Sequence, residues 1–234
     1  MTTHDAAKLQ IGLFICPNCY IPDIIGVYTV FSIIPECDIH FIWKDKDLIV
    51  GYPNFPMHAT TTFAECPPNL DVLCIGATPA DLPDEALLFL AEKGNRAKYL
   101  IGICGGGLML AVAGLLEGYH ATANFSLVDN LSEFGAVPVK GGEVVIDRNR
   151  ITAGPISGSF EAGLIVLGKL RGEEAAKEAE LTLEYAPHPP YGTGSPELAG
   201  IELTQKVTQK YEALYGELLE AARQASERLA VLKA

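Results

Sequence analysis

One cysteine lies at the junction between a short apolar run and a helix-like segment. Residues 98–103 predict a buried strand, and residues 108–116 are largely apolar with helical character. Cys104 lies between them and is followed directly by glycines, so the chain must turn sharply there. Such a strand-to-helix turn is a nucleophile elbow, where the helix dipole and free N–H groups favour thiolate over thiol. We therefore predict that Cys104 is a nucleophile; the alternative is a cysteine that packs as a small apolar side chain.

A cysteine nucleophile needs an acid or base within hydrogen-bond reach. Asp23 follows the first predicted strand, residues 10–16, in a segment with apolar neighbours that would raise its pKa. We predict that Asp23 is the general acid/base; an aspartate that only caps the following helix is the alternative. The histidines are not in positions that predict a Cys-His-Asp triad. They are His4, His40, His58, His120 and His188.

Ligands of open α/β sheets bind beyond the carboxyl ends of the strands, so the residues that follow predicted strands are candidates for substrate binding. The backbone N–H groups of the elbow glycines could bind developing negative charge, although glycine there could also serve only to permit the turn. The glycines match no phosphate-binding loop, so we reject nucleotide binding. The predicted substrate- or oxyanion-binding residues are Gly76, Ala77, Gly105, Gly106, Asn124 and Gly154.

The chain has six cysteines, and two of them form a C-x-x-C motif, Cys16 and Cys19. No second pair or histidine cluster accompanies the motif, so we predict no metal site. A redox dithiol remains an open alternative for these two residues. Without a secretory signal, the cysteines are expected to be free thiols rather than a disulfide framework.

Length and composition limit the classes of function. The 234 residues suit one α/β domain with appendages, and 49% hydrophobic residues indicate a large core. A net charge of −12 argues against a nucleic-acid partner. No apolar run is long enough to span a bilayer, and the first ten residues lack the pattern of a signal peptide. We therefore expect a cytoplasmic protein.

Apolar strands alternate with helical segments along most of the chain, which predicts a parallel sheet covered on both faces, a doubly wound α/β sandwich. We assign residues 1–184 to this domain. Residues 185–196 are rich in proline and glycine and should run extended, and residues 198–234 read as a charged amphipathic helix. We expect this arm and helix, residues 185–234, to pack on a second copy of the chain; packing on its own domain is the alternative.

The elbow and its surroundings resemble the ThiJ/PfpI superfamily, which has a flavodoxin-like sandwich. Three further stretches, residues 21–31, 60–75 and 183–196, resemble the isocyanide hydratase family in particular, and the resemblance extends over about residues 10–200. It implies a cofactor-free homodimeric enzyme that hydrates an isocyanide to an N-substituted formamide. Carried over by motif, Cys104 would attack the isocyanide carbon to give a thioimidate, and Asp23 would act as acid and base.

The chain departs from that family around the expected pocket. Gly105 stands where a threonine is usual, residues 76–78 replace a Pro-Gly-Gly-type turn, and Asn124-Phe125 replaces a His-Trp pair. Ala153-Gly154-Pro155 stands where the family carries a glycine run. Two alternatives therefore remain: cysteine chemistry on another small electrophile, as in glyoxalases or deglycases, and a non-enzymatic redox sensor that uses Cys104.

Overall fold

The computed structural model describes residues 8–234. The first seven residues, with His4 and most of the segment tested for a signal peptide, lie outside the described part. Within residues 8–234, no helix is both long and apolar enough to cross a membrane.

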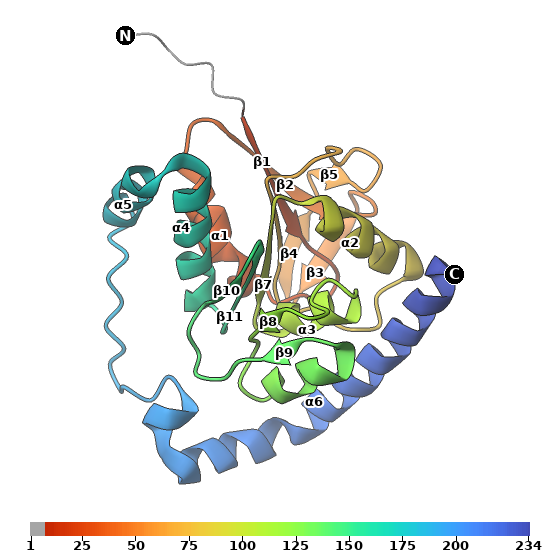
Figure 1. Ribbon diagram of the computed structural model, residues 1–234, viewed down its shortest axis with the longest axis vertical. Coiled ribbons are helices and arrows are strands. Elements are labelled where there is room, and N and C mark those ends of the chain that lie inside the picture. The colour runs from red at the N-terminus through yellow and green to blue at the C-terminus, as the bar shows by residue number, and fades with distance from the viewer. Residues whose placement is uncertain (1–7) are drawn as a thin grey trace.

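A seven-stranded sheet forms the centre of the molecule, in the order β10-β11-β7-β6-β1-β2-β5 (Figure 1). All neighbouring pairs are parallel except β10 with β11. The central strands are almost wholly buried, as strands covered on both faces must be, and this confirms the predicted parallel sandwich. The strands are β1 (Leu9–Phe14), β2 (Cys37–Trp43), β5 (Thr61–Thr62), β6 (Val72–Ile75), β7 (Tyr99–Ile103), β10 (Val145–Asp147) and β11 (Arg150–Ala153).

Helices cover both faces of this sheet (Figure 1). One face carries α1 (Pro22–Ser32) and α4 (Ser157–Arg171), which pack together closely because Gly26 and Gly163 leave room for the facing helix. The other face carries α2 (Asp84–Arg96) and α3 (Gly105–Val112). A further helix, α5 (Glu173–Thr182), packs on α4 and was not predicted from the sequence.

Smaller elements fill the connections. A hairpin in the β2–β6 connection consists of β3 (Leu48–Gly51) and β4 (Phe55–His58). A 3-10 helix, η1 (Val128–Phe134), follows β8 (His120–Ala121) in the chain. The short strand β9 (Val137–Pro138) pairs with β8. Short strands of this kind leave the adjoining loops free to shape the edge of the sheet.

The C-terminal segment consists of the predicted extended arm and a long helix, α6 (Pro196–Lys233), with a kink at Gly200. The second half of α6 packs on its own domain: Arg228 donates to the carbonyl of Leu82, and Lys233 to that of Ala113. The arm and the first turns of α6 are mostly exposed, and Figure 1 shows the arm running away from α5. Packing on the same chain therefore accounts for the end of α6, and partner binding stays a prediction for the arm and the first turns.

Candidate active site

The carboxyl ends of four parallel strands, β1, β6, β7 and β11, meet at one edge of the sheet. Cys104 follows β7 directly, and its backbone N–H donates to the carbonyl of Ala153 at the end of β11 (2.9 Å). Its backbone has φ +57° and ψ −124°. Such a conformation is costly for a residue with a side chain and is concentrated at functional sites. The predicted strand-to-helix turn at Cys104 is therefore present, and α3 begins at the next residue.

Asp23 lies in the first turn of α1 and is fully buried. Its two carboxylate oxygens accept hydrogen bonds from different loops: Oδ2 from the N–H of Ala77 (3.0 Å) and Oδ1 from the N–H of Ile156 (3.1 Å). Its carboxylate also interacts with the Cys104 thiol by a hydrogen bond. The residue is thus not the N-cap of α1, a place taken by Ile21, but a carboxylate fixed beside the sulfur.

Burial dominates the electrostatics of this pair. It raises the pKa of Asp23 above its ordinary value, although the two backbone N–H groups act in the opposite direction. It also raises the pKa of Cys104 to about 12, and the charge of Asp23 acts in the same sense. The N–H of Gly105 and the amide of Asn124 act in the opposite direction and favour ionisation of the Cys104 thiol, as expected for an elbow cysteine, whereas burial and the carboxylate favour the protonated form.

Hydrogen-bond donors lie on the other side of the sulfur. Nδ2 of Asn124 is 3.9 Å from Sγ of Cys104 and lowers the pKa of the thiol, and its Oδ1 is held by the N–H of Ser126. The N–H of Gly105 acts on the sulfur as well. Gly106 is in the first turn of α3, where N–H groups have no acceptor within the helix. The structure thus places Asn124 and Gly105 at the thiol, and Gly106 follows Gly105 in α3.

Two of the predicted binding residues are glycines at positions where the surrounding atoms leave no room for a side chain. A Cβ on Gly76 would lie 2.7 Å from Cβ of Asp23, and one on Gly106 would lie within contact of the Ile75 carbonyl, so both positions require glycine. Gly154 lies two residues before Ile156 and a Cβ there would meet only the carbonyl of Gly142, at 3.7 Å. Gly154 is therefore next to the site, with no direct contact to the sulfur recorded.

Two residues at the site were missed by sequence reasoning. Ile156, a β-branched residue at φ +55°, presents its N–H to Asp23. Tyr215 of α6 is half-buried, and its pKa is raised first by burial and then by the charges of Cys104, Tyr211 and Asp23. Pro155 before Ile156 was a weak signal of a turn, whereas nothing local in the sequence of α6 indicated its approach.

The histidines of the described segment have hydrogen-bond partners other than Cys104 and Asp23. Within residues 8–234, no three His, Cys, Asp or Glu side chains are grouped so as to hold a metal ion. The partners are Gln10 and Thr61 for His40, the Lys46 carbonyl for His58, Asp147 for His120 and the Ala186 carbonyl for His188.

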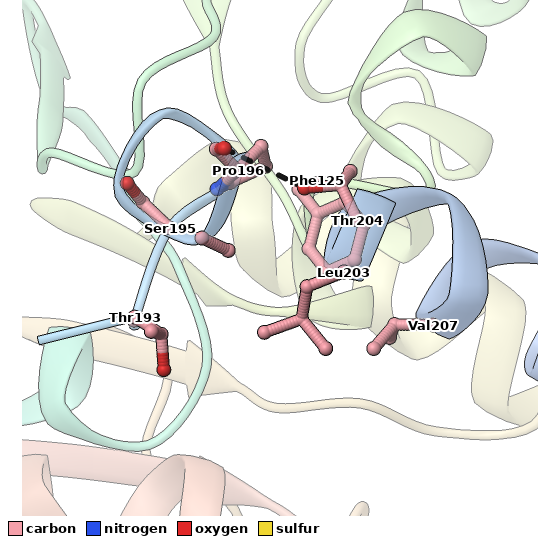
Figure 2. A pocket seen from close by; sticks show the side chains of 9 residues that line it. Phe125, Thr193, Ser195, Pro196, Leu203, Thr204 and Val207 are labelled. Atoms are coloured by element: carbon pink, nitrogen blue, oxygen red, sulfur yellow. Dashed lines mark hydrogen bonds between the residues drawn. The ribbon is translucent and has the colours of Figure 1, made fainter. Parts of the chain in front are cut away.

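A mainly apolar cavity of about 290 Å³ lies between Phe125 and the start of α6. Figure 2 shows Leu203 and Val207 of α6 and the ring of Phe125 along this cavity, with Thr193 and Ser195 of the arm beside them. Phe125, which lines the cavity, follows Asn124 in the chain, and the side-chain amide of Asn124 is 3.9 Å from the Cys104 sulfur. Its wall comes from the C-terminal segment, which the sequence alone did not place at the site.

Known proteins match this chain along most of its length. Residues 17–167 match the DJ-1/PfpI family. An isonitrile hydratase of Pseudomonas putida is 36% identical over 195 residues, which are 82% of this chain and 85% of the relative. The crystal structure of a ThiJ/PfpI family protein from Pseudomonas syringae superposes with a TM-score of 0.84 at 32% identity, covering 94% of this chain and 91% of the other.

More distant structures share the fold alone. DJ-1beta of Drosophila melanogaster has a TM-score of 0.66 at 17% identity, and it covers 77% of this chain and all of its own. The family match includes the elbow at Cys104 and the carboxylate at Asp23, which are also the centre of the site described above. The chain belongs to the DJ-1/PfpI family.

Proposed function

We propose that this protein hydrates isonitriles, R–NC, also called isocyanides, to N-substituted formamides, with Cys104 as nucleophile and Asp23 as general acid/base. The observation that carries the proposal is the buried Asp23 carboxyl beside the Cys104 thiol, fixed by the N–H groups of Ala77 and Ile156. Similarity to a relative named isonitrile hydratase supports a hydratase of the DJ-1/PfpI family.

The first step uses the proton that the resting site holds. Because the thiol is protonated at neutral pH, Asp23 takes its proton as the sulfur becomes nucleophilic. Asp23 then gives this proton to the terminal carbon of the isonitrile while the sulfur bonds to the same carbon. The product is a thioimidate, R–N=CH–S–Cys104, and Asp23 is again a carboxylate.

The second step adds water. Asp23 accepts a proton from a water molecule, whose oxygen bonds to the thioimidate carbon, and then gives this proton to the thioimidate nitrogen, so that Asp23 is again a carboxylate. In the tetrahedral adduct, the oxygen would lie near the N–H groups of Gly105 and Gly106 and the amide of Asn124, which are placed to bind it. The C–S bond then breaks, the hydroxyl proton passes through Asp23 to the sulfur, and a formamide and the free thiol result.

Raised pKa values suit this reaction better than they suit a redox sensor. Burial and the charge of Asp23 raise the pKa of the Cys104 thiol to about 12, which disfavours the thiolate, the form that peroxide oxidises. An isonitrile, in contrast, requires delivery of a proton to carbon together with sulfur attack. We therefore prefer the hydratase to a sensor in which Cys104 itself is the oxidised residue.

We place the group R of the substrate in the apolar cavity beside Phe125, because Phe125 follows Asn124, whose side-chain amide is 3.9 Å from the thiol. We also propose a homodimer in which the arm and the first turns of α6 are covered, because Tyr191, Leu198 and Ile201 are exposed there. Light scattering after gel filtration measures the mass; a monomer at micromolar concentration contradicts the dimer.

The decisive experiment is to incubate the purified protein with a panel of alkyl and aryl isonitriles and to measure formamide. We expect turnover by the wild type and loss of turnover in Cys104→Ala and Asp23→Asn, while Cys37→Ser, a cysteine far from the elbow at the start of β2, retains it. No turnover of any isonitrile by the wild type contradicts the function. Turnover that survives Cys104→Ala contradicts the mechanism.

A further inference from the structure

A second pair of reactive groups, which the proposed reaction does not use, lies at the end of β1. The backbone N–H of Cys19 donates to the carbonyl of Cys16 (3.2 Å), which closes a β-turn over Cys16-Pro17-Asn18-Cys19. Asn18 has φ +60°. Proline at the second position and a positive φ at the third are typical of a type II turn. A closed turn brings its end Cα atoms within 7 Å, which overlaps the range of 4.4–6.8 Å found in disulfides.

The two sulfur atoms already interact. The backbone N–H of Cys16 donates to Sγ of Cys19 (3.4 Å), and the Cys16 thiol is hydrogen-bonded to the same sulfur. These donors lower the pKa of Cys19 and leave Cys16 as the protonated partner, its pKa raised. Both cysteines are buried, while Pro17 and Asn18 between them are exposed, so the turn that holds the pair reaches the surface. The pair therefore consists of one thiol stabilised as thiolate and a second within reach.

We propose that Cys16 and Cys19 form a reversible dithiol–disulfide site that is oxidised by hydrogen peroxide and that lowers the activity of the Cys104 site when oxidised. The Cys19 sulfur attacks one peroxide oxygen, the O–O bond breaks, and a sulfenic acid and water are formed. The Cys16 thiol then attacks this sulfur, the S–O bond breaks, and a second water leaves. The two thiols lose two electrons and two protons in total, and peroxide is reduced to water.

The turn is connected to the general acid/base by backbone hydrogen bonds. Tyr20 follows Cys19 directly, and its N–H donates to the carbonyl of Ala77 (2.8 Å), whose own N–H donates to Oδ2 of Asp23. The carbonyl of Tyr20 accepts from the N–H of Asp23 (3.2 Å). A disulfide of about 2.05 Å is much shorter than any non-bonded sulfur contact, so the turn must contract when it forms. Tyr20 then transmits the movement to both Ala77 and Asp23.

The size of the effect follows from the precision that proton transfer needs. A displacement of about 1 Å in a catalytic group can cost about 10²-fold in rate. We expect oxidation of the pair to lower kcat by about tenfold or more and a dithiol reductant to restore it. This effect on activity rests on the proposed function, whereas formation of the disulfide does not.

The chemistry is tested first in Cys104→Ala, which removes the elbow thiol. The protein is treated with hydrogen peroxide, free thiols are alkylated with iodoacetamide, and the peptide with Cys16 and Cys19 is examined by mass spectrometry. We expect loss of two hydrogens and no alkylation, reversed by dithiothreitol. Cys104→Ala with Cys19→Ser is the matched control and must not show this mass. A peptide that stays a dithiol under conditions that oxidise Cys37 or Cys66 overturns the proposal.

The coupling is tested by assaying isonitrile hydration after the same treatment. The wild type should lose activity and regain it with dithiothreitol, and Cys16→Ser and Cys19→Ser should lack this component beyond any that Cys104 itself contributes. A complete disulfide with unchanged kcat overturns the coupling. If no isonitrile is hydrated even by reduced protein, the proposed function fails, and the mass measurement still decides whether the disulfide forms.

Discussion

Two cysteine-bearing turns follow strands of the same sheet edge, and they differ in what faces the sulfur. At the elbow, the Cys104 thiol lies beside the carboxylate of Asp23, and its pKa is raised to about 12. In the turn after β1, Cys19 faces the Cys16 thiol and a backbone N–H, and its pKa is lowered. The same residue type is therefore held with its proton in one turn and favoured as thiolate in the other.

The backbone differs between the two turns as well. At the elbow, Cys104 itself has a positive φ, whereas in the turn after β1 Asn18 takes the positive φ and the cysteines do not. Strain borne by the reacting residue fixes its side chain at the edge of the sheet. A turn strained at Asn18 leaves both sulfurs free to approach each other. The comparison teaches that neighbouring groups and turn geometry, rather than residue type or position at a strand end alone, decide which protonation form of a cysteine is favoured.

Removal of the Asp23 carboxylate should have the largest effect on the difference between the Cys104 turn and the Cys19 turn. Asp23→Asn should lower kcat for isonitrile hydration by about 10³-fold, because the proton carrier is lost. The same change should lower the pKa of Cys104, since both the charge of Asp23 and its hydrogen bond to the thiol raise that pKa. Alkylation of the Cys104 peptide, followed against pH by mass spectrometry, should therefore move to lower pH.

The pH dependence of kcat/KM in the wild type provides a second test of the role of Asp23. Because Asp23 must be ionised to accept the proton, kcat/KM should rise with pH through a pKa above 3.8, and this limb should be absent from any residual activity of Asp23→Asn. A variant that is both less active and slower to alkylate would show that Asp23 does not raise the pKa of the thiol.

Displacing the carboxylate without removing it should have a smaller effect. In Gly76→Ala, the new Cβ would lie 2.7 Å from Cβ of Asp23, so α1 or the loop must shift. We expect kcat to fall by about 10- to 100-fold with the fold retained, since a small misplacement of a catalytic group is costly. The measurement is steady-state kinetics with circular dichroism.

A matched control separates the site from general effects of glycine replacement. Gly216 lies in α6 with nothing within 4 Å of a built Cβ, so Gly216→Ala should keep full activity and gain slightly in helix stability. Equal losses of activity in the two variants would remove the argument that Gly76 acts through Asp23.

The sequence was sufficient for the elbow because local patterns determine it. Apolar residues of β7 pass without a polar linker into α3, and only a sharp turn at Cys104 satisfies both elements. Asp23 was found for a related reason: it follows β1, and parallel strands bring their carboxyl ends to one edge. Local sequence thus fixed which residues reach the edge, although it did not give their protonation, which depends on burial from every side.

Contacts between distant segments account for what sequence reasoning missed. Tyr215 is nearly 200 residues from Asp23 along the chain, and its approach depends on where α6 packs. Ile156 supplies its N–H only because of a positive φ that disfavours a β-branched residue, so propensity argued against it.

Removing the amide beside the elbow thiol should sharpen the comparison further. The Asn124 amide lies 3.9 Å from Sγ of Cys104 and lowers the pKa of this thiol. Asn124→Ala deletes this donor, so the pKa of the thiol should rise and kcat should fall by about 3- to 10-fold. Asn130→Ala, which removes an amide bonded only to exposed Glu133, is the control. An unchanged alkylation profile of Cys104 would show that the amide does not act on the sulfur.

The smallest effect is expected from the turn after β1. Asn18→Ala should cost about 1 kcal/mol of unfolding free energy, because a residue with a Cβ and no local polar group is disfavoured at φ +60°. Asn18→Gly should be as stable as the wild type or slightly more so, since glycine adopts this conformation freely. Denaturant unfolding of the reduced proteins measures both. Equal stability of the alanine and glycine variants would mean that the positive φ at Asn18 carries no strain, and the contrast with Cys104 would then rest on the groups facing each sulfur alone.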